Sequence, residues 1–245
     1  MTMVPNISDV SEVYTGAAGV LASASVPRML VDSSTIGPAA AAAVGEAVAT
    51  RAAELGAPDT AFVDAPVSGA VPGATNATLT FMVGGDRDDV ARAGPLLELM
   101  GTKIVHCGGL GAGQAAKLAN NVALAMQMAS IAEALTLGVR LGVDPATLTE
   151  IFDNSTSGCW SSRVNNPWPG VVEGSAASRG YQGGFAARLC AKDLGLAVVA
   201  GKGVGATLPM TARIEELYNG IAKDEELAGK DFAVYLKAIQ AMANN

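Results

Sequence analysis

The sequence changes character near residue 111, and this change limits the possible folds more than any other feature of the chain. Up to residue 110, short β-branched runs alternate with alanine-rich stretches, which is typical of a parallel sheet covered by helices. Beyond Gly113 no strand pattern remains, and residues 114–141 form one unbroken stretch of apolar and small residues with polar residues on one face. We therefore expect an α/β domain over residues 1–112 and an all-α domain over residues 113–245, joined by a long, largely buried helix.

The same patterns place the individual elements. Strands are expected where short β-branched runs are bounded by turn residues, at 29–32, 61–64, 79–83 and 103–106. Helices are expected where apolar residues recur at helical spacing, at 39–55, 88–100, 114–141, 145–152, 189–200, 211–222 and 231–242. Two glycine-containing stretches, 69–78 and 155–184, are expected to be loops, and the second is expected to be ordered because it lacks low-complexity sequence.

Composition excludes several classes of partner. Half of the 245 residues are apolar and only 16% are charged, which favours a folded chain with a buried core over a disordered one. The formal net charge is -7 and no cluster of Lys and Arg interrupts it, so we expect no nucleic-acid partner. No apolar run reaches about 18 residues without a charged or polar break, so we expect no membrane partner either.

The reactive residue types narrow the chemistry. Cys107, Cys159 and Cys190 lie far apart and include no C-x-x-C pair, so neither a disulfide framework nor a metal site is expected, and a reducing compartment fits best. His106 is the only histidine, and no G-x-S-x-G motif is present. The sequence therefore argues against a hydrolase with a serine or cysteine nucleophile.

Two predicted strands end in small hydroxyl residues. In DSSTIGP, Ser34 and Thr35 follow a strand and precede a helix, so they either face a ligand at the carboxyl end of the strand or cap the helix. In DAPVSGA, Ser68 and Gly69 follow the next strand, where the hydroxyl and the amides either hold a carboxylate or form an ordinary turn.

A glycine motif at the start of the long helix is similar to a dinucleotide fingerprint. Gly111-x-Gly113-x-x-Ala116 follows a strand and opens a helix. We interpret it as a false match, because the acidic residue about 20 positions on, Glu133, falls inside the long helix and not at the end of a second strand. The glycines are expected to let the chain pass tightly from the sheet into the helix.

Charged residues lie at the start of two apolar helices. Lys117 and Asn121 are spaced i, i+4 and so share one helix face. A buried lysine loses its charge easily and can transfer a proton near neutral pH, with Asn121 orienting a hydroxyl or carboxylate beside it; the alternative is a lysine whose amine extends to solvent. For Lys192 and Asp193, the favoured interpretation is an acid stabilised by the helix dipole.

Four ordered motifs, DSSTIGP, DAPVSGA, GGLGAGQAAKLANN and GFAARLCAKDLGLA, resemble the β-hydroxyacid dehydrogenase family over essentially the whole chain. The stretch GCWSSRVNNPWPGVVEG followed by YQGGF resembles members acting on 3-hydroxyisobutyrate more than those acting on tartronate semialdehyde or 6-phosphogluconate. The resemblance implies a Rossmann-type domain followed by a helical domain that also forms homodimers or higher homo-oligomers. The implied reaction is oxidation of 3-hydroxyisobutyrate by NAD to methylmalonate semialdehyde, a step of valine breakdown, and NADP stays open as the cofactor.

The resemblance also implies roles for single residues. It makes Lys117 the catalytic lysine. The residues implied to bind the substrate are Ser68, Gly69, Asn121 and Ala70, which stands where the family usually has a second glycine. The residues implied to face the nicotinamide cofactor are Val4, Pro5, Thr35 and Lys192.

The beginning of the chain departs from the family pattern. The family opens with a strand, a G-x-G-x-x-G loop and a helix, whereas this sequence opens with MTMVPN, which resembles the segment after the third strand. We therefore expect an N-terminal dinucleotide-binding half of about 70 residues to be missing, with the pyrophosphate cradle and the acidic ribose partner. Without its neighbouring strand, the segment at residues 29–32 would expose a sheet edge.

Two functions stay open at this point. The first is a dehydrogenase acting on 3-hydroxyisobutyrate, or a related tartronate semialdehyde reductase. The second is a catalytically inactive remnant that acts as a dimerising or substrate-binding module. The expected compartment is the mitochondrial matrix for a eukaryotic source and the cytoplasm for a bacterial one.

Overall fold

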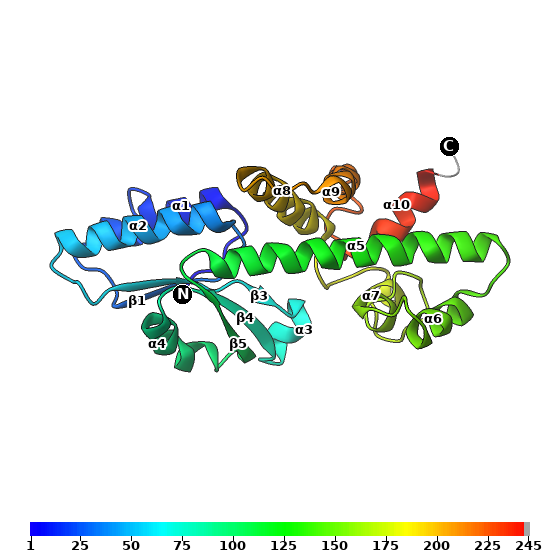
Figure 1. The fold of residues 1–245 in the computed structure, drawn as a ribbon, viewed down its shortest axis with the longest axis horizontal. Coiled ribbons are helices and arrows are strands. Elements are labelled where there is room, and N and C mark those ends of the chain that lie inside the picture. Colours follow the sequence, from blue (N-terminus) through cyan, green and yellow to red (C-terminus); the bar gives the residue numbers. More distant parts are fainter. Residues whose placement is uncertain (243–245) are drawn as a thin grey trace. The chain divides into compact units, whose positions relative to one another are not determined.

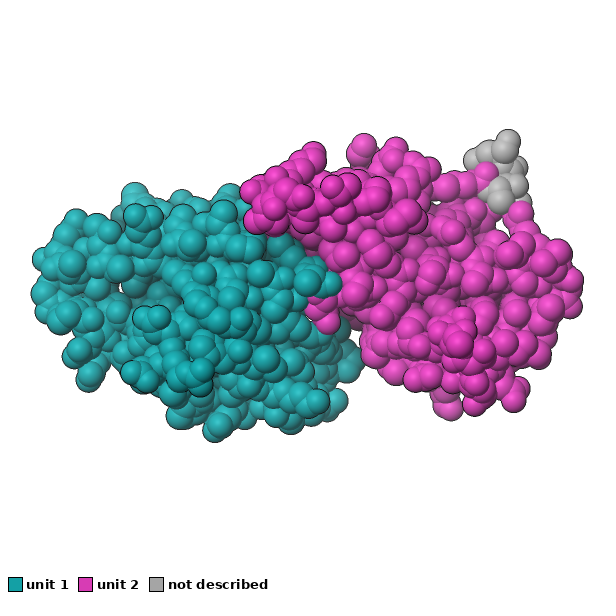
Figure 2. Space-filling view, in the orientation of Figure 1, with its two compact units in different colours: residues 1–119 teal, residues 120–245 magenta. Residues whose placement is uncertain are grey.

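The computed structural model describes residues 1–242, which fall into two compact units. Unit 1 comprises Met1–Ala119, and unit 2 comprises the described residues from Asn120 onward (Figure 2). The long helix α5 (Ala112–Arg140) contributes its first two turns to unit 1 and the remainder to unit 2. The boundary between the units along the chain therefore falls within this helix, after Ala119.

Unit 1 is built on a mixed five-stranded sheet. Its strands are β1 (Met29–Asp32), β2 (Ala61–Asp64), β3 (Val67–Ser68), β4 (Leu79–Gly84) and β5 (Gly101–Gly108). The pairs β1/β2 and β4/β5 are parallel, but β4 runs antiparallel to β2 and β3. Parallel pairing dominates, as expected for a partial Rossmann-type sheet, and the antiparallel pairing of β4 with β2 and β3 is the exception. The chain continues from β2 directly into β3 and then turns back into β4, so that Asp64 opposes Gly84 and Val67 opposes Phe81.

Helices cover both faces of this sheet (Figure 1). Successive residues of β1 point to opposite faces. Leu30 packs with α1 (Ile7–Thr15) and α2 (Pro38–Glu54), whereas Val31 packs with α4 (Arg87–Leu97). Neither α1 nor α3 was predicted, and α3 occupies part of the stretch predicted as a glycine-rich loop. The helical elements of unit 1 are α1 (Ile7–Thr15), η1 (Val20–Ala22), α2 (Pro38–Glu54), α3 (Ala70–Thr75) and α4 (Arg87–Leu97).

The first residues of the chain pair with β1. The amide of Thr2 donates to the carbonyl of Val31 at 2.9 Å, and the amide of Ser33 donates to the carbonyl of Thr2 at 2.8 Å, in a parallel bridge between Thr2 and Asp32. The expectation of an exposed edge is therefore wrong at the Val31–Ser33 end of β1, where both hydrogen bonds lie. The pairing also places Val4 and Pro5 immediately beyond a strand-like segment that is parallel to β1.

The described residues of unit 2 form helices and connecting loops, with no strand among them. Its core joins α5 to α8, α9 and α10, and buries Met128, Leu194, Tyr218 and Phe232. The predicted helices are present, and α7 is an additional short helix inside the predicted loop. The elements after α5 are α6 (Pro145–Asn154), α7 (Trp160–Arg163), η2 (Ala177–Arg179), α8 (Ala187–Gly203), α9 (Pro209–Ala222), η3 (Phe232–Val234) and α10 (Tyr235–Met242).

Helix α5 is less buried than the sequence suggested. By length and composition alone it could cross a membrane, with a mean hydropathy of 1.6 over its most apolar 18 residues, of which 33% are buried. Its inner face supplies Ala125, Met128 and Ala132 to the core of unit 2. Its outer face carries exposed small and charged residues and the exposed Leu137. Helix α5 is therefore a core helix with one solvent-exposed face, here called its open face. The expectation of a largely buried helix is wrong for this face.

A buried carboxylate orders the long loop of unit 2. Asp231 accepts hydrogen bonds from the side-chain amide of Asn165 at 2.8 Å and from the backbone amides of Ala233 at 3.0 Å and Phe185 at 2.9 Å. Gly184 has φ +76, and a Cβ there would overlap this carboxylate, so only glycine fits. Burial raises the pKa of Asp231, and the three hydrogen bonds oppose that shift. The predicted ordered loop is thus held in its interior, at Asn165, and immediately after its last residue, at Phe185.

Replacing Asp231 by Asn tests this role. Whichever way the new amide is turned, its NH2 group faces a hydrogen-bond donor, so we expect the free energy of unfolding to fall by about 1–3 kcal/mol. Asp224→Asn is the control, because one oxygen of this exposed carboxylate accepts both of its amides, from Glu226 and Leu227, and Asn keeps that oxygen. Urea unfolding measures both variants, and equal effects would contradict the assignment.

Candidate active site

The carboxyl end of β1 is a hydrogen-bonded turn centred on Ser34. Its Oγ donates to Asp32 Oδ1 at 2.7 Å and accepts from the amide of Val4 at 2.9 Å. Helix α2 begins after Gly37, with no side-chain cap, so the interpretation of Ser34 or Thr35 as a helix cap is wrong. The turn instead joins the Val4–Pro5 segment to Ser33–Thr35 at the carboxyl ends of two parallel segments.

Asp32 lies beneath this turn and is fully buried. Its Oδ1 accepts from the hydroxyl of Ser34 and from the hydroxyl of Thr2 at 2.8 Å, whereas its Oδ2 is buried without a hydrogen-bond partner. Thr2 Oγ1 also lies 2.8 Å from the hydroxyl of Tyr14 on α1. Burial raises the pKa of Asp32, and it raises that of Tyr14 to about 12. The buried acid therefore fixes the Thr2–Val4 segment through hydroxyl groups.

Gln114 ties the same turn to α5, and sequence reasoning did not single it out. Its Oε1 accepts from the amides of Ile36 at 2.9 Å and Gly37 at 3.0 Å, and its Nε2 donates to the carbonyl of Ser34 at 2.8 Å. The side chain is fully buried. The available signal was a long polar side chain in the first turn of an otherwise apolar helix.

Asp64 occupies the N-terminus of α5. Its Oδ1 accepts from the amide of Gly111 at 2.7 Å and its Oδ2 from the amide of Gln114 at 2.8 Å. A Cβ on Gly84 or Gly113 would overlap this carboxylate or the backbone beside it, so the glycines permit the close approach. These contacts support the interpretation of the glycine motif as a false match, because its amides bind an internal carboxylate.

The Ser68–Gly69–Ala70 segment links β3 to α3. Gly69 has φ +139, a conformation that suits glycine. Ala70 has φ +51, where an L-residue is strained by roughly 1–2 kcal/mol. The alanine therefore occupies a left-handed position at which a glycine would be unstrained. Ser68 opposes Thr80 on β4.

Lys117 lies on α5, one turn after Gln114, and is 8% exposed. Asn121 follows one turn later, and its Nδ2 donates to Asp193 Oδ2 at 2.6 Å. Lys192 Nζ lies 3.2 Å from Asp193 Oδ1. Asp193 is the seventh residue of α8, so the interpretation of it as a first-turn acid stabilised by the helix dipole is wrong. It instead links Asn121 to Lys192 within unit 2.

The cofactor expected from the sequence can be compared with this geometry. Nucleotides bind open α/β sheets at the carboxyl ends of parallel strands, where Val4–Pro5 and Ser33–Thr35 lie. The position of these residues is therefore compatible with a bound nucleotide. The amides at the start of α5 do not fit the pyrophosphate, because Asp64 accepts their hydrogen bonds. Residues 1–242 contain no further unit of a strand, a G-x-G-x-x-G loop and a helix.

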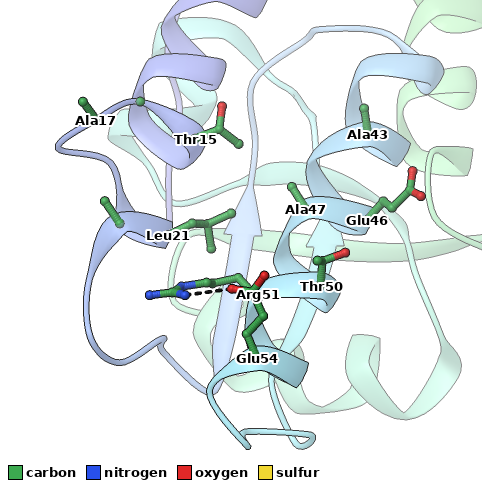
Figure 3. Close-up of a pocket in the computed structure, with 11 residues that line it drawn as sticks. Thr15, Ala17, Leu21, Ala43, Glu46, Ala47, Thr50, Arg51 and Glu54 are labelled. Carbon is green, nitrogen blue, oxygen red and sulfur yellow. Dashed lines mark hydrogen bonds and ion pairs between the residues drawn. The ribbon is translucent and has the colours of Figure 1, made fainter.

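A separate hollow of about 620 Å³ lies between the α1–η1 segment and α2 (Figure 3). Thr15 and Leu21 line one side, and Thr50, Arg51 and Glu54 line the other. Arg51 is held by Glu54 at 2.8 Å and by the carbonyl of Ser23 at 3.0 Å. The hollow contains none of the predicted site residues.

Comparison with protein families matches both halves of the chain. Residues 1–109 match the NAD-binding domain of 6-phosphogluconate dehydrogenase, and residues 111–239 match the family described as "NAD-binding of NADP-dependent 3-hydroxyisobutyrate dehydrogenase". The match over residues 1–109 does not support the expectation that the dinucleotide-binding half is missing from this chain.

Individual relatives agree with these families. The chain is 45% identical to a 3-hydroxyisobutyrate dehydrogenase of Pseudomonas aeruginosa, over 95% of this chain and 76% of that protein. It is 48% identical to the human mitochondrial 3-hydroxyisobutyrate dehydrogenase, over 80% of this chain and 56% of that protein. A solved structure of the Mycobacterium tuberculosis 3-hydroxyisobutyrate dehydrogenase with L-serine superposes with a TM-score of 0.85 at 41% identity, over 98% of this chain and 78% of that one.

The pH dependence of stability tests the environment of Asp32. Its pKa is higher in the folded state than the ordinary 3.8, so the folded protein binds more protons than the unfolded chain, and stability falls as pH rises through that window. Asp32→Asn keeps the oxygen that receives every donor and carries no charge. We expect this variant to gain stability relative to the wild type as pH rises from about 4, as measured by urea unfolding at a series of pH values.

Asp64→Asn is the matched control. Burial also raises the pKa of Asp64, but its two oxygens accept from different amides, so Asn leaves one amide of α5 unpaired. We expect Asp64→Asn to be less stable than the wild type at neutral pH. If the difference in the free energy of unfolding between Asp32→Asn and the wild type did not change with pH, the raised pKa assigned to Asp32 would be contradicted.

Proposed function

Because this chain belongs to the 3-hydroxyisobutyrate dehydrogenase family, we propose that it oxidises 3-hydroxyisobutyrate to methylmalonate semialdehyde with NAD as the hydride acceptor. The observation that supports this most directly is the burial of Lys117 on a helix anchored to the ends of β1 and β2. Lysine is a strong candidate for proton transfer in a chain with a single histidine.

The reaction requires a base and a defined position for the alcohol. Oxidation of a primary alcohol removes the proton of the hydroxyl oxygen and a hydride from the carbon that bears this oxygen, and NAD, when bound, accepts the hydride. Lys117, in its neutral form, takes the hydroxyl proton.

The remaining site residues bind and orient. Ser68 and the Gly69–Ala70 backbone bind the substrate carboxylate, and Asn121, held by Asp193, orients the hydroxyl. Val4, Pro5, Thr35 and Lys192 face the nicotinamide. The hydrogen bond between the Val4 amide and Ser34 Oγ keeps two of these segments in register. In this proposal the rate enhancement comes mainly from positioning the substrate and the nicotinamide next to one base, Lys117.

In this proposal the cellular compartment depends on the organism from which the protein comes. The eukaryotic relatives carry the description mitochondrial. We place the protein in the mitochondrial matrix of a eukaryote or the cytoplasm of a bacterium.

Lys117→Ala tests the proposed reaction. We expect wild-type protein to form NADH from NAD and 3-hydroxyisobutyrate, and Lys117→Ala to lose about 10²–10⁴-fold in kcat, because the base is removed. The affinity for NAD, measured by fluorescence titration, stays within about threefold, since Lys117 acts on the substrate proton.

Lys103→Ala is the control, because Lys103 is an exposed lysine on β5 outside the site. It is expected to keep the wild-type rate. A Lys117→Ala variant with more than a tenth of the wild-type kcat would refute the assigned base. Absence of NADH formation by the wild type would refute the reaction and favour a substrate-binding module.

We propose further that two copies associate through the open face of α5. Leu137 and Leu141 are 62% and 74% exposed, and Ile151 on α6 is also exposed. In this arrangement a two-fold axis close to Leu137 would bring Glu133, whose Oε1 also accepts from the hydroxyl of Tyr235 at 3.0 Å, near Arg140 of the other copy, so that the two faces would be complementary in charge. Burial of large apolar side chains then drives the association.

Leu137→Glu tests this interface. It introduces an acid at the proposed axis, beside the same acid of the other copy, so we expect the wild type to sediment as a dimer or higher oligomer and this variant to dissociate. Leu99→Glu, at a 73% exposed position of unit 1, is expected to keep the wild-type assembly. A monomeric wild type, or an unchanged Leu137→Glu, would exclude the interface.

A further inference from the structure

We infer that Gln114 is a positioning residue for this reaction, a role that rests on the proposed function. It connects the turn that carries Thr35 with the helix that carries Lys117. The inference depends on contacts within unit 1.

Both the oxygen and the nitrogen of the Gln114 side-chain amide form hydrogen bonds. Oε1 accepts from two consecutive backbone amides, at Ile36 and Gly37, and Nε2 donates to the carbonyl of Ser34. The partners lie 77 to 80 residues away in sequence. Thr35 is therefore enclosed between backbone groups that a single side chain holds.

The chemistry of these contacts selects glutamine. The turn presents two donors and one acceptor to a fully buried position, and a neutral amide with an acceptor oxygen and a donor nitrogen satisfies all three. An ionised glutamate accepts from the two amides but directs its second oxygen at the Ser34 carbonyl. An aliphatic residue leaves all three backbone groups unpaired in the interior.

A continuous series of contacts leads from Val4, which is proposed to face the nicotinamide, to the helix that carries Lys117. Ser34 accepts from the amide of Val4 through its Oγ and from Gln114 through its carbonyl. The backbone of Gln114 is itself fixed, because its amide donates to Asp64. Lys117 follows one turn later on the same helix. If the hydrogen bonds of the Gln114 side chain are lost, the turn at Thr35 can therefore move relative to the first turns of α5, which carry Lys117.

This arrangement predicts a loss of rate with little change in binding. Displacement of reacting groups by about 1 Å can cost on the order of 100-fold in rate, whereas the groups that bind the substrate remain present. The signature of Gln114 is therefore a change in kcat with smaller changes in the KM values of NAD and substrate.

Gln114→Glu tests the role through pH. The protonated acid can donate to the Ser34 carbonyl and reproduce all three bonds, but the ionised acid cannot. With the wild-type chain active, we expect kcat of this variant to lie at least tenfold below wild type at pH 9 and within about threefold at pH 6, with both KM values within about threefold.

Asn166→Asp is the matched control. Asn166 is another fully buried amide, whose Nδ2 donates to Thr149 Oγ1 and to the Ser162 carbonyl, each at 3.1 Å. The same change from amide to carboxyl there is expected to lower thermal stability but to leave kcat per folded molecule unchanged across the pH range. Circular dichroism at each pH measures the folded fraction of every variant.

Gln114→Asn provides a second variant with no ionisable group. Its amide is one methylene shorter and cannot reach all three partners, so kcat falls at least tenfold at every pH. The inference is overturned if folded Gln114→Glu has the same pH dependence of kcat as the wild type. It is also overturned if the fall in kcat of Gln114→Glu only reflects its folded fraction, or if neither Gln114 variant folds. A wild type without turnover refutes the reaction itself, and the role of Gln114 with it.

Discussion

The carboxylate of Asp64 at the start of α5 is the interaction on which the arrangement of unit 1 depends. It accepts from the amides of Gly111 and Gln114, at the end of the helix where the free amides and the helix dipole favour negative charge. Gly84 and Gly113 leave the space that the carboxylate occupies. The helix therefore starts from a point fixed to the end of β2, and its first turns carry Gln114 and Lys117 from that point.

Buried acids repeat this function elsewhere in the chain. Asp32 joins Thr2 to Ser34 at the end of β1, and Asp231 joins the long loop of unit 2 to the segment before α8. Burial opposes the charge of each acid and raises its pKa, so each is stable only where several donors converge on it. The hydrogen bonds from these donors hold segments that are far apart in sequence at fixed separations. A site of defined geometry needs such fixed separations.

Local patterns were a good guide to elements with strong hydrophobic periodicity. β1 and β2 have the predicted bounds, and the start of the long helix lies within two residues of its prediction. The two-residue strand β3 and the helix α3 were missed, because each depends on pairing or packing with β4 and not on its own sequence. The direction of β4 was also beyond local reasoning, since strand polarity depends on how the connecting segment returns.

The sequence by itself determined the fold class, the family resemblance and the residue types available for chemistry, because apolar periodicity and ordered motifs are properties of the linear chain. Lys117 stood out for this reason, as a lysine in an apolar helix. Only the tertiary structure revealed that Gln114 holds the turn at Ser34, that Thr2 pairs with β1, and that Asp64 occupies the glycine motif. These are bonds between groups tens of residues apart, and the partner of a buried donor or acceptor is decided by how the chain closes on itself.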